Sequence, residues 1–130
     1  MKADLIENNV ILSRTIDFSL SVISYCELLE SEKKYIVARQ LLRSGTLIGA
    51  NSFEAQNCES NADFIHKFKI AAKEINETQY WLLLCKRSEN YPDCEELLKK
   101  VEEIDRIVNK IISSAKKKKP LSYFLALFMF

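Results

Sequence analysis

The spacing of apolar residues between Phe64 and Cys85 limits the fold more than any other feature of this sequence. Small and apolar side chains recur there at alternating intervals of four and three residues: Phe64, Phe68, Ala71, Ile75, Thr78, Leu82 and Cys85. This interval places them on one stripe of a helix that packs at coiled-coil angles. Ser60 and Asp63 form a capping box just before the stripe. The pattern predicts a long helix that begins after Ser60.

A second stripe with the same spacing predicts another helix near the C-terminus. Its members are Cys94, Leu97, Val101, Ile104, Val108, Ile111 and Ala115. Pro92 suits the first turn of this helix, where a missing amide hydrogen costs nothing. Pro120 follows four lysines, 116–119, and is expected to end the helix.

The first half of the chain predicts two further helices. One runs from about Lys34 to Asn57 and carries a stripe of mostly small residues: Ala38, Leu41, Gly45, Ile48, Ser52 and Ala55. Gly45 and Gly49 lie four residues apart and allow a neighbouring backbone to approach closely. The other helix is less regular, ends near the charged turn 30–33, and carries Ile11, Phe18, Val22, Tyr25 and Leu29.

Turn residues are scarce, with two glycines and two prolines in 130 residues. Few turn residues favour long helices with short connections, and short connections make successive helices antiparallel. The sequence therefore predicts an all-α fold, an antiparallel up-and-down four-helix bundle over residues 1–119.

Residues 120–130, PLSYFLALFMF, form a nearly uncharged, aromatic-rich C-terminal tail. The tail is too short to span a bilayer, which takes about 20 helical residues. The favoured interpretation is a segment docked on this bundle or on another subunit. Contact with a membrane surface, assisted by the preceding lysines, is an alternative, and disorder is another.

Net charge and cysteine usage describe the expected compartment. The formal net charge is +1, which gives no global case for nucleic acid or an acidic membrane. The N-terminus lacks the pattern of a signal peptide. The four cysteines, with no C-x-x-C spacing, are interpreted as reduced thiols, with disulfides as the less favoured alternative. The expected location is cytoplasmic.

Catalytic chemistry lacks its usual residues in this sequence. A di-iron bundle needs two Glu-x-x-His pairs, but His66 is the single histidine, so no metal or cofactor is expected. A cysteine nucleophile would need His66 beside it. Gly45 and Gly49 lie within a helix and lack the lysine of a phosphate-binding loop. The sequence is therefore interpreted as non-catalytic.

Polar residues gather on the two middle helices of the predicted bundle. They are Arg39, Arg43, Ser44, Asn51 and Glu54 on one helix, and Lys67, Lys73, Glu74 and Glu77 on the next. Antiparallel pairing would set Arg43 and Ser44 beside Glu74, and Asn51 beside Lys67. Two interpretations remain open. One is a partly buried ion-pair network that fixes helix register or a subunit contact, and the other is a phosphate site with Arg43, Lys67 and Lys73 as donors.

Tyr80, Trp81 and Leu84 widen the apolar face of the third helix beyond its stripe. Such a surface suits a contact between subunits. The equal alternative is that these side chains complete the bundle's own core.

Several motifs together resemble the signature of bacterial 23S rRNA intervening-sequence proteins, also called the four-helix-bundle protein family. The matching stretches are 40–46 (QLLRSGT), 48–51 (IGAN), 54–56 (EAQ), 62–67 (ADFIHK), 72–74 (AKE), 76–78 (NET) and 80–82 (YWL), with Ser60. The resemblance extends from about Ile11 to Ser114. It implies a compact bundle that assembles into a ring, typically a homopentamer, without an established catalytic activity. It also implies kinship with the accessory protein of diversity-generating retroelements, which is thought to bind nucleic acid and is far more basic than this chain.

The expected function follows from both the residues and the resemblance. It is a homo-oligomeric scaffold whose ring gathers Arg39, Arg43, Lys67 and Lys73 into a surface for RNA or DNA. The alternative is a protein–protein adaptor that binds no nucleic acid. A metal-dependent enzyme is the third and least favoured interpretation.

Overall fold

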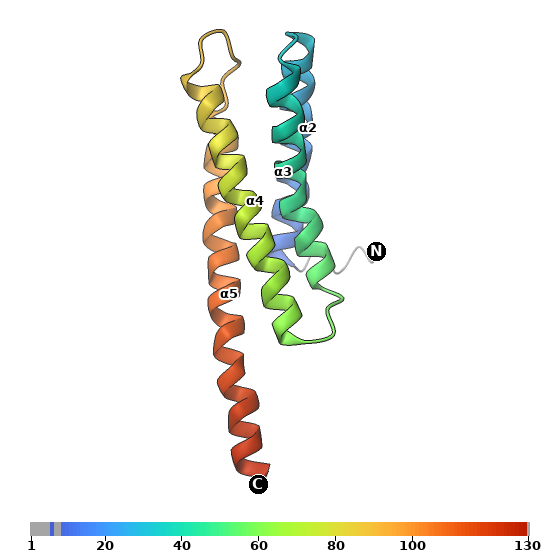
Figure 1. Cartoon of the computed structure of the whole chain (residues 1–130), viewed down its shortest axis with the longest axis vertical. Helices are drawn as coiled ribbons and strands as arrows, with labels where there is room; N and C mark the ends of the chain where they lie inside the picture. The colour runs from blue at the N-terminus through green and yellow to red at the C-terminus, as the bar shows by residue number, and fades with distance from the viewer. Residues whose placement is uncertain (1–5, 7–8, 130) are drawn as a thin grey trace.

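Four long helices form the protein in the computed structural model, which describes the backbone of Ile6 and residues 9–129 and the side chains up to residue 117. They are α2 (Val10–Ser31), α3 (Tyr35–Ala55), α4 (Asn61–Arg87) and α5 (Glu95–Met129). Successive helices are antiparallel, and each packs against two neighbours, with α2 and α5 closing the bundle. The up-and-down four-helix bundle predicted from residue spacing is confirmed (Figure 1).

The predicted stripes form the core. Every stripe residue predicted for α2 and α3 is buried, as are all those of α4 except half-buried Phe64 and all those of α5 except half-buried Ile111. The largest fully buried side chains include Phe18 of α2, Leu41 of α3 and Phe68 of α4. Burial of each such side chain stabilises the fold by about 1.5–3 kcal/mol. Among the described residues, no helix is both long and apolar enough to cross a membrane.

The glycines of α3 allow α2 to approach closely, as predicted. A Cβ atom added at Gly45 would lie 3.0 Å from both methyl carbons of Val22. One added at Gly49 would lie 3.1 Å from the Cβ of Thr15. Side chains of α2 therefore occupy the space that larger residues of α3 would need.

Helix ends agree with the capping prediction at α4 and differ at α5. The Ser60 side chain accepts a hydrogen bond from the amide of Asp63 at 3.1 Å, as expected of a helix cap. The prediction that Pro92 lies in the first turn of the last helix is wrong, because α5 begins at Glu95. Pro92 belongs to the preceding loop, where its carbonyl accepts a 2.7 Å hydrogen bond from the Tyr25 hydroxyl.

The prediction that Pro120 ends the last helix is also wrong. Helix α5 continues through Pro120 to Met129 and runs past the end of the bundle (Figure 1). Proline removes one helical hydrogen bond and crowds the preceding turn, at a cost of about 3 kcal/mol. The cost is local, and good helix formers such as Leu121, Leu125 and Ala126 follow it. The 120–130 tail is thus a continuation of α5 as far as the described backbone reaches, not a segment folded back onto its own bundle.

Candidate functional site

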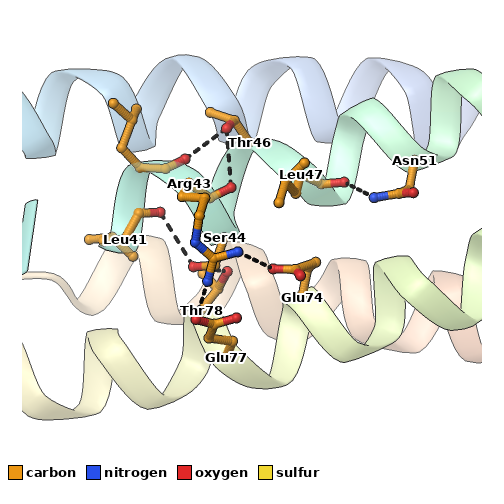
Figure 2. A network of polar contacts seen from close by, with 10 residues as sticks. Leu41, Arg43, Ser44, Thr46, Leu47, Asn51, Glu74, Glu77 and Thr78 are labelled. Atoms are coloured by element: carbon orange, nitrogen blue, oxygen red, sulfur yellow. Dashed lines mark hydrogen bonds and ion pairs between the residues drawn. The ribbon is translucent and has the colours of Figure 1, made fainter. Parts of the chain in front are cut away.

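Part of the polar group predicted on the two middle helices meets along the α3–α4 seam (Figure 2). Arg43 of α3 reaches across to two carboxylates of α4. Its guanidinium hydrogen-bonds Glu77 and lies 3.5 Å from an oxygen of Glu74. The predicted pairing of Arg43 with Glu74 is therefore observed, and Arg43 bridges two successive turns of α4.

The two carboxylates experience different environments. Burial raises the pKa of Glu74, and the neighbouring charge of Glu77 adds to that effect. The hydrogen bond from Arg43 lowers the pKa of Glu77. The Oε2 atom of Glu74 is buried and has no hydrogen-bond donor among the described residues, since the 3.5 Å approach of Arg43 is an ion pair only. Arg43 therefore stabilises the ionised form of Glu77, whereas burial disfavours the ionised form of Glu74.

Beneath this pair lies a buried hydrogen bond between the two helices. The Thr78 hydroxyl donates to the Ser44 hydroxyl at 2.9 Å, and both residues are fully buried. Ser44 in turn approaches the carbonyl of Leu41 at 3.4 Å. Thr78 appeared in the sequence only as a member of the apolar stripe, so its polar role was missed.

Lower on the seam, the side chains of Asn51 and Lys67, expected to lie side by side, bond different partners. Asn51 is buried and donates to the carbonyl of Leu47 in its own helix at 2.8 Å. Lys67 instead forms a 3.2 Å ion pair with Glu54. A short polar side chain inside a helix readily bonds a carbonyl one turn back. Lys67 pairs instead with the longer, exposed side chain of Glu54.

Two of the four predicted phosphate donors are thus engaged by carboxylates, and two are not. Arg39 and Lys73 are exposed, and neither makes an ion pair within the described part of the chain. Lys73 lies near enough to Glu74 for its charge to favour the ionised carboxylate. Four basic and three acidic side chains leave this face only slightly positive. The arrangement suits a register lock between α3 and α4 better than a closed phosphate pocket.

The predicted contact residues of α4 divide between the core and the surface. Trp81 is half-buried and packs against the core, edge-on to Tyr80 with ring centroids 5.7 Å apart. Tyr80 is mostly exposed and Leu84 is half-buried, while Leu83, absent from the prediction, is exposed. The Trp81 Nε1 atom is buried near the Glu77 carboxylate, whose charge it favours, but no hydrogen bond of normal geometry joins them.

An open polar cleft of about 420 Å³ lies at the α3–α4 turn. It is lined by Glu54, Asn57, Cys58, Glu59, Asp63, His66 and Lys67. The Cys58 thiol approaches the Glu54 carbonyl at 3.7 Å, and no hydrogen bond joins it to His66 in the described structure. Across residues 6 and 9–117, no three His, Cys, Asp or Glu side chains are arranged to hold a metal ion.

The four antiparallel helices, joined across α3 and α4 by the ion pairs of Arg43, place the chain in the class of compact all-α four-helix bundles. The chain belongs to the 23S rRNA-intervening sequence protein family, whose sequence profile matches residues 7–110. The family resemblance seen in the sequence is thereby confirmed.

A solved structure supports the same assignment. It is the 1.70 Å crystal structure of a protein with unknown function from the S23 ribosomal protein family of Bacteroides thetaiotaomicron VPI-5482. The two chains are 38% identical with a TM-score of 0.75, and the match covers 78% of this chain and 97% of that one. No curated protein matches the chain.

Proposed function

We propose that this chain is a non-catalytic scaffold that assembles with copies of itself through the outer face of α4. The observation that supports this proposal most directly is the exposure of large apolar side chains on that face, where Tyr80 is 57% and Leu83 is 40% exposed. Isolated exposed apolar residues are ordinary, but neighbouring ones that include aromatic rings are typical of subunit contacts. The register set by Arg43 and its partners brings Ile36, which is 74% exposed, to about the same level of the bundle.

A second apolar surface on other helices supports a ring. Leu20 of α2 is 60% exposed and borders a shallow, mostly apolar groove between α2 and α3 that Ile16, Ala50 and Phe53 also line. A ring forms when one surface of each subunit binds a different surface of the next. The α4 face and the α2–α3 groove provide two such surfaces, and the family resemblance favours five subunits.

Light scattering of the purified full chain at micromolar concentration tests the assembly. We expect a mass of several subunits, which the double variant Tyr80→Lys/Leu83→Lys reduces to that of a monomer. The control is Val10→Lys, because Val10 is equally exposed at the start of α2, well away from these residues along the bundle. A monomeric wild type would refute the scaffold, and an unchanged mass in the double variant would refute this contact.

RNA or DNA is the second part of the proposal, and the exposed Arg39 and Lys73 favour it. Neither side chain forms an ion pair in the described part of the chain, so both charges are available to phosphate groups. Repetition around a ring would multiply the small positive charge of one face.

Fluorescence anisotropy with structured 23S rRNA fragments and random single strands, across a salt series, tests this part. We expect affinity to fall steeply with salt, and Arg39→Ala or Lys73→Ala to reduce the salt slope by about one per lost phosphate contact. Arg43→Ala is a poor probe because it also unpairs two carboxylates. Lys99→Ala, exposed on α5, is the control. An oligomer that binds neither nucleic acid at low salt would instead favour the protein–protein adaptor.

A further inference from the structure

The last helix extends beyond every other helix of the bundle. Asn61, the first residue of α4, donates a 2.9 Å hydrogen bond to the carbonyl of Ala115. Helix α4 therefore begins at the level of Ala115 and does not accompany α5 beyond it. Helix α5 then continues to Met129 (Figure 1). At 1.5 Å per residue, the segment 116–129 projects about 20 Å from the bundle.

The projecting segment also lies outside the region shared with the family. The family profile matches residues 7–110, so 116–129 lie outside the matched region. Its function must therefore be derived from its own residues.

Those residues change abruptly in character at Pro120. Lys116–Lys119 form a run of four positive charges, and no charged residue occurs from 120 to 130. Ser122 and the hydroxyl of Tyr123 are the only polar side-chain groups in that stretch. A helix that docks one face on a protein keeps a polar opposite face, whereas a helix that is apolar all round suits surroundings that are apolar on every side.

We propose that residues 120–129 insert into one leaflet of a membrane rich in anionic lipids, with Lys116–Lys119 among the headgroups. Ten helical residues measure about 15 Å, which matches half of the roughly 30 Å hydrocarbon core. Lysines beside an apolar helix bind anionic headgroups, and the two signals together hold a protein at a membrane. Exposed Lys110 adds to the positive charge, while Glu59 and Asp63 near this end of the bundle only partly offset it.

Co-sedimentation of the full chain with lipid vesicles tests this anchor. One set of vesicles is phosphatidylcholine alone, and the other contains one third phosphatidylglycerol. We expect strong binding to the anionic vesicles and at least tenfold weaker binding to the neutral ones. Lys116→Gln and Lys117→Gln should each weaken binding about fivefold. Leu125→Glu/Phe128→Glu should abolish it.

Matched control variants distinguish a specific membrane anchor from nonspecific adsorption to vesicles. Leu28→Glu changes an exposed leucine of α2, and Lys99→Gln changes an exposed lysine within the bundle. Both should bind anionic vesicles as the wild type does. Circular dichroism and urea unfolding should show that Leu125→Glu/Phe128→Glu leaves the bundle folded, because its sites lie beyond Ala115.

Each other outcome overturns the proposal in a recognisable way. Equal binding to neutral and anionic vesicles would remove the role of the lysines. No vesicle binding, together with a lower mass for Leu125→Glu/Phe128→Glu in light scattering, would assign the segment to a contact between copies. No effect of that variant on vesicle binding or mass would refute the anchor outright. The α4 contact is tested separately, by the mass of Tyr80→Lys/Leu83→Lys.

Discussion

The Thr78 hydroxyl of α4 donates a 2.9 Å hydrogen bond to the Ser44 hydroxyl of α3, and both residues are fully buried. The Arg43 ion pairs with Glu74 and Glu77 lie directly outside it (Figure 2). A one-turn slip of α3 against α4 would bury both hydroxyls without this contact. The polar pair therefore selects one register among several that the apolar stripe alone would accept.

Removal of the buried hydroxyl contact should destabilise the bundle. Thr78→Val keeps the shape of the side chain, and we expect it to lower the free energy of unfolding by about 1 kcal/mol in urea titrations. Ser44→Ala should cost about 1–3 kcal/mol because it leaves the Thr78 hydroxyl unpaired. The double variant should cost less than the sum. Thr46→Val is the control, since the Thr46 hydroxyl bonds only carbonyls of its own helix; an equal loss there would argue against a special role for Thr78.

Gly45→Ala should destabilise the protein although alanine favours helices by about 1 kcal/mol. Its new methyl would meet both methyl groups of Val22 at 3.0 Å, and overpacking of this kind costs about 1–3 kcal/mol. We expect Gly45→Ala/Val22→Ala to unfold at a higher urea concentration than the sum of the single effects implies, because the added methyl then fills space that Val22 leaves. Additive effects would show that the close approach of α2 is not the cause.

Neutralisation of the two seam carboxylates should have opposite effects on stability. The pKa of Glu77 is lowered by Arg43, so its charge stabilises the fold at neutral pH, and this contribution is lost as pH falls through the folded pKa. The pKa of Glu74 is raised by burial, so protonation of Glu74 stabilises the fold, and this contribution is lost as pH rises through its folded pKa. At pH 7, Glu77→Gln should therefore unfold more easily than wild type and Glu74→Gln less easily.

Both differences should shrink in acid, where the wild-type carboxylates take up protons themselves. Urea titrations of the two variants at pH 7 and pH 4 measure this convergence. A loss of stability in both variants at pH 7 would mean that Glu74 contributes mainly through its ion pair with Arg43.

Cysteine reactivity should distinguish Cys58 from the three core thiols. Burial raises the pKa of Cys26 to about 12 and that of Cys94 to about 11, and it also raises the pKa of Cys85. Only thiolates react quickly with aromatic disulfide reagents. At pH 8 we expect one fast-reacting thiol in the native wild-type protein and none in native Cys58→Ser. In urea, all four thiols of the wild type should react fast. Any fast thiol in folded Cys58→Ser would contradict the burial of the other three.

Residue spacing predicted the bundle because the stripes are long and regular. Seams of four-and-three spacing such as Phe68 to Cys85 have one good solution, a helix packed on helices, and the scarcity of turn residues left little choice of topology. Antiparallel pairing then predicted the contact of Arg43 with Glu74, since both lie at similar distances from one short turn. Local pattern and simple geometry were sufficient for these features.

Contacts that depend on exact side-chain reach could not be predicted in the same way. The Tyr25 hydroxyl bonds the carbonyl of Pro92, 67 residues away in the sequence, and no local pattern signals that choice. Asn51 bonds a carbonyl of its own helix while Lys67 pairs with Glu54, and the helix register alone does not decide between these partners. The passage of α5 through Pro120 shows a related limit, since a proline signals a break but neighbouring residues decide whether it occurs.

The short turns between α2, α3 and α4 also determine how the chain reaches its native state. Most partners in these helix pairs are separated by little chain, as with Ser44 and Thr78, so closing each hairpin costs little loop entropy. Helical bundles with such local topology fold in microseconds to milliseconds. The pairing of α2 with α5 is the exception, because it joins the first and the last of the four helices in the chain. We expect the middle hairpin to be structured in the transition state, with φ-values highest near Ser44 and lowest along the α2–α5 seam.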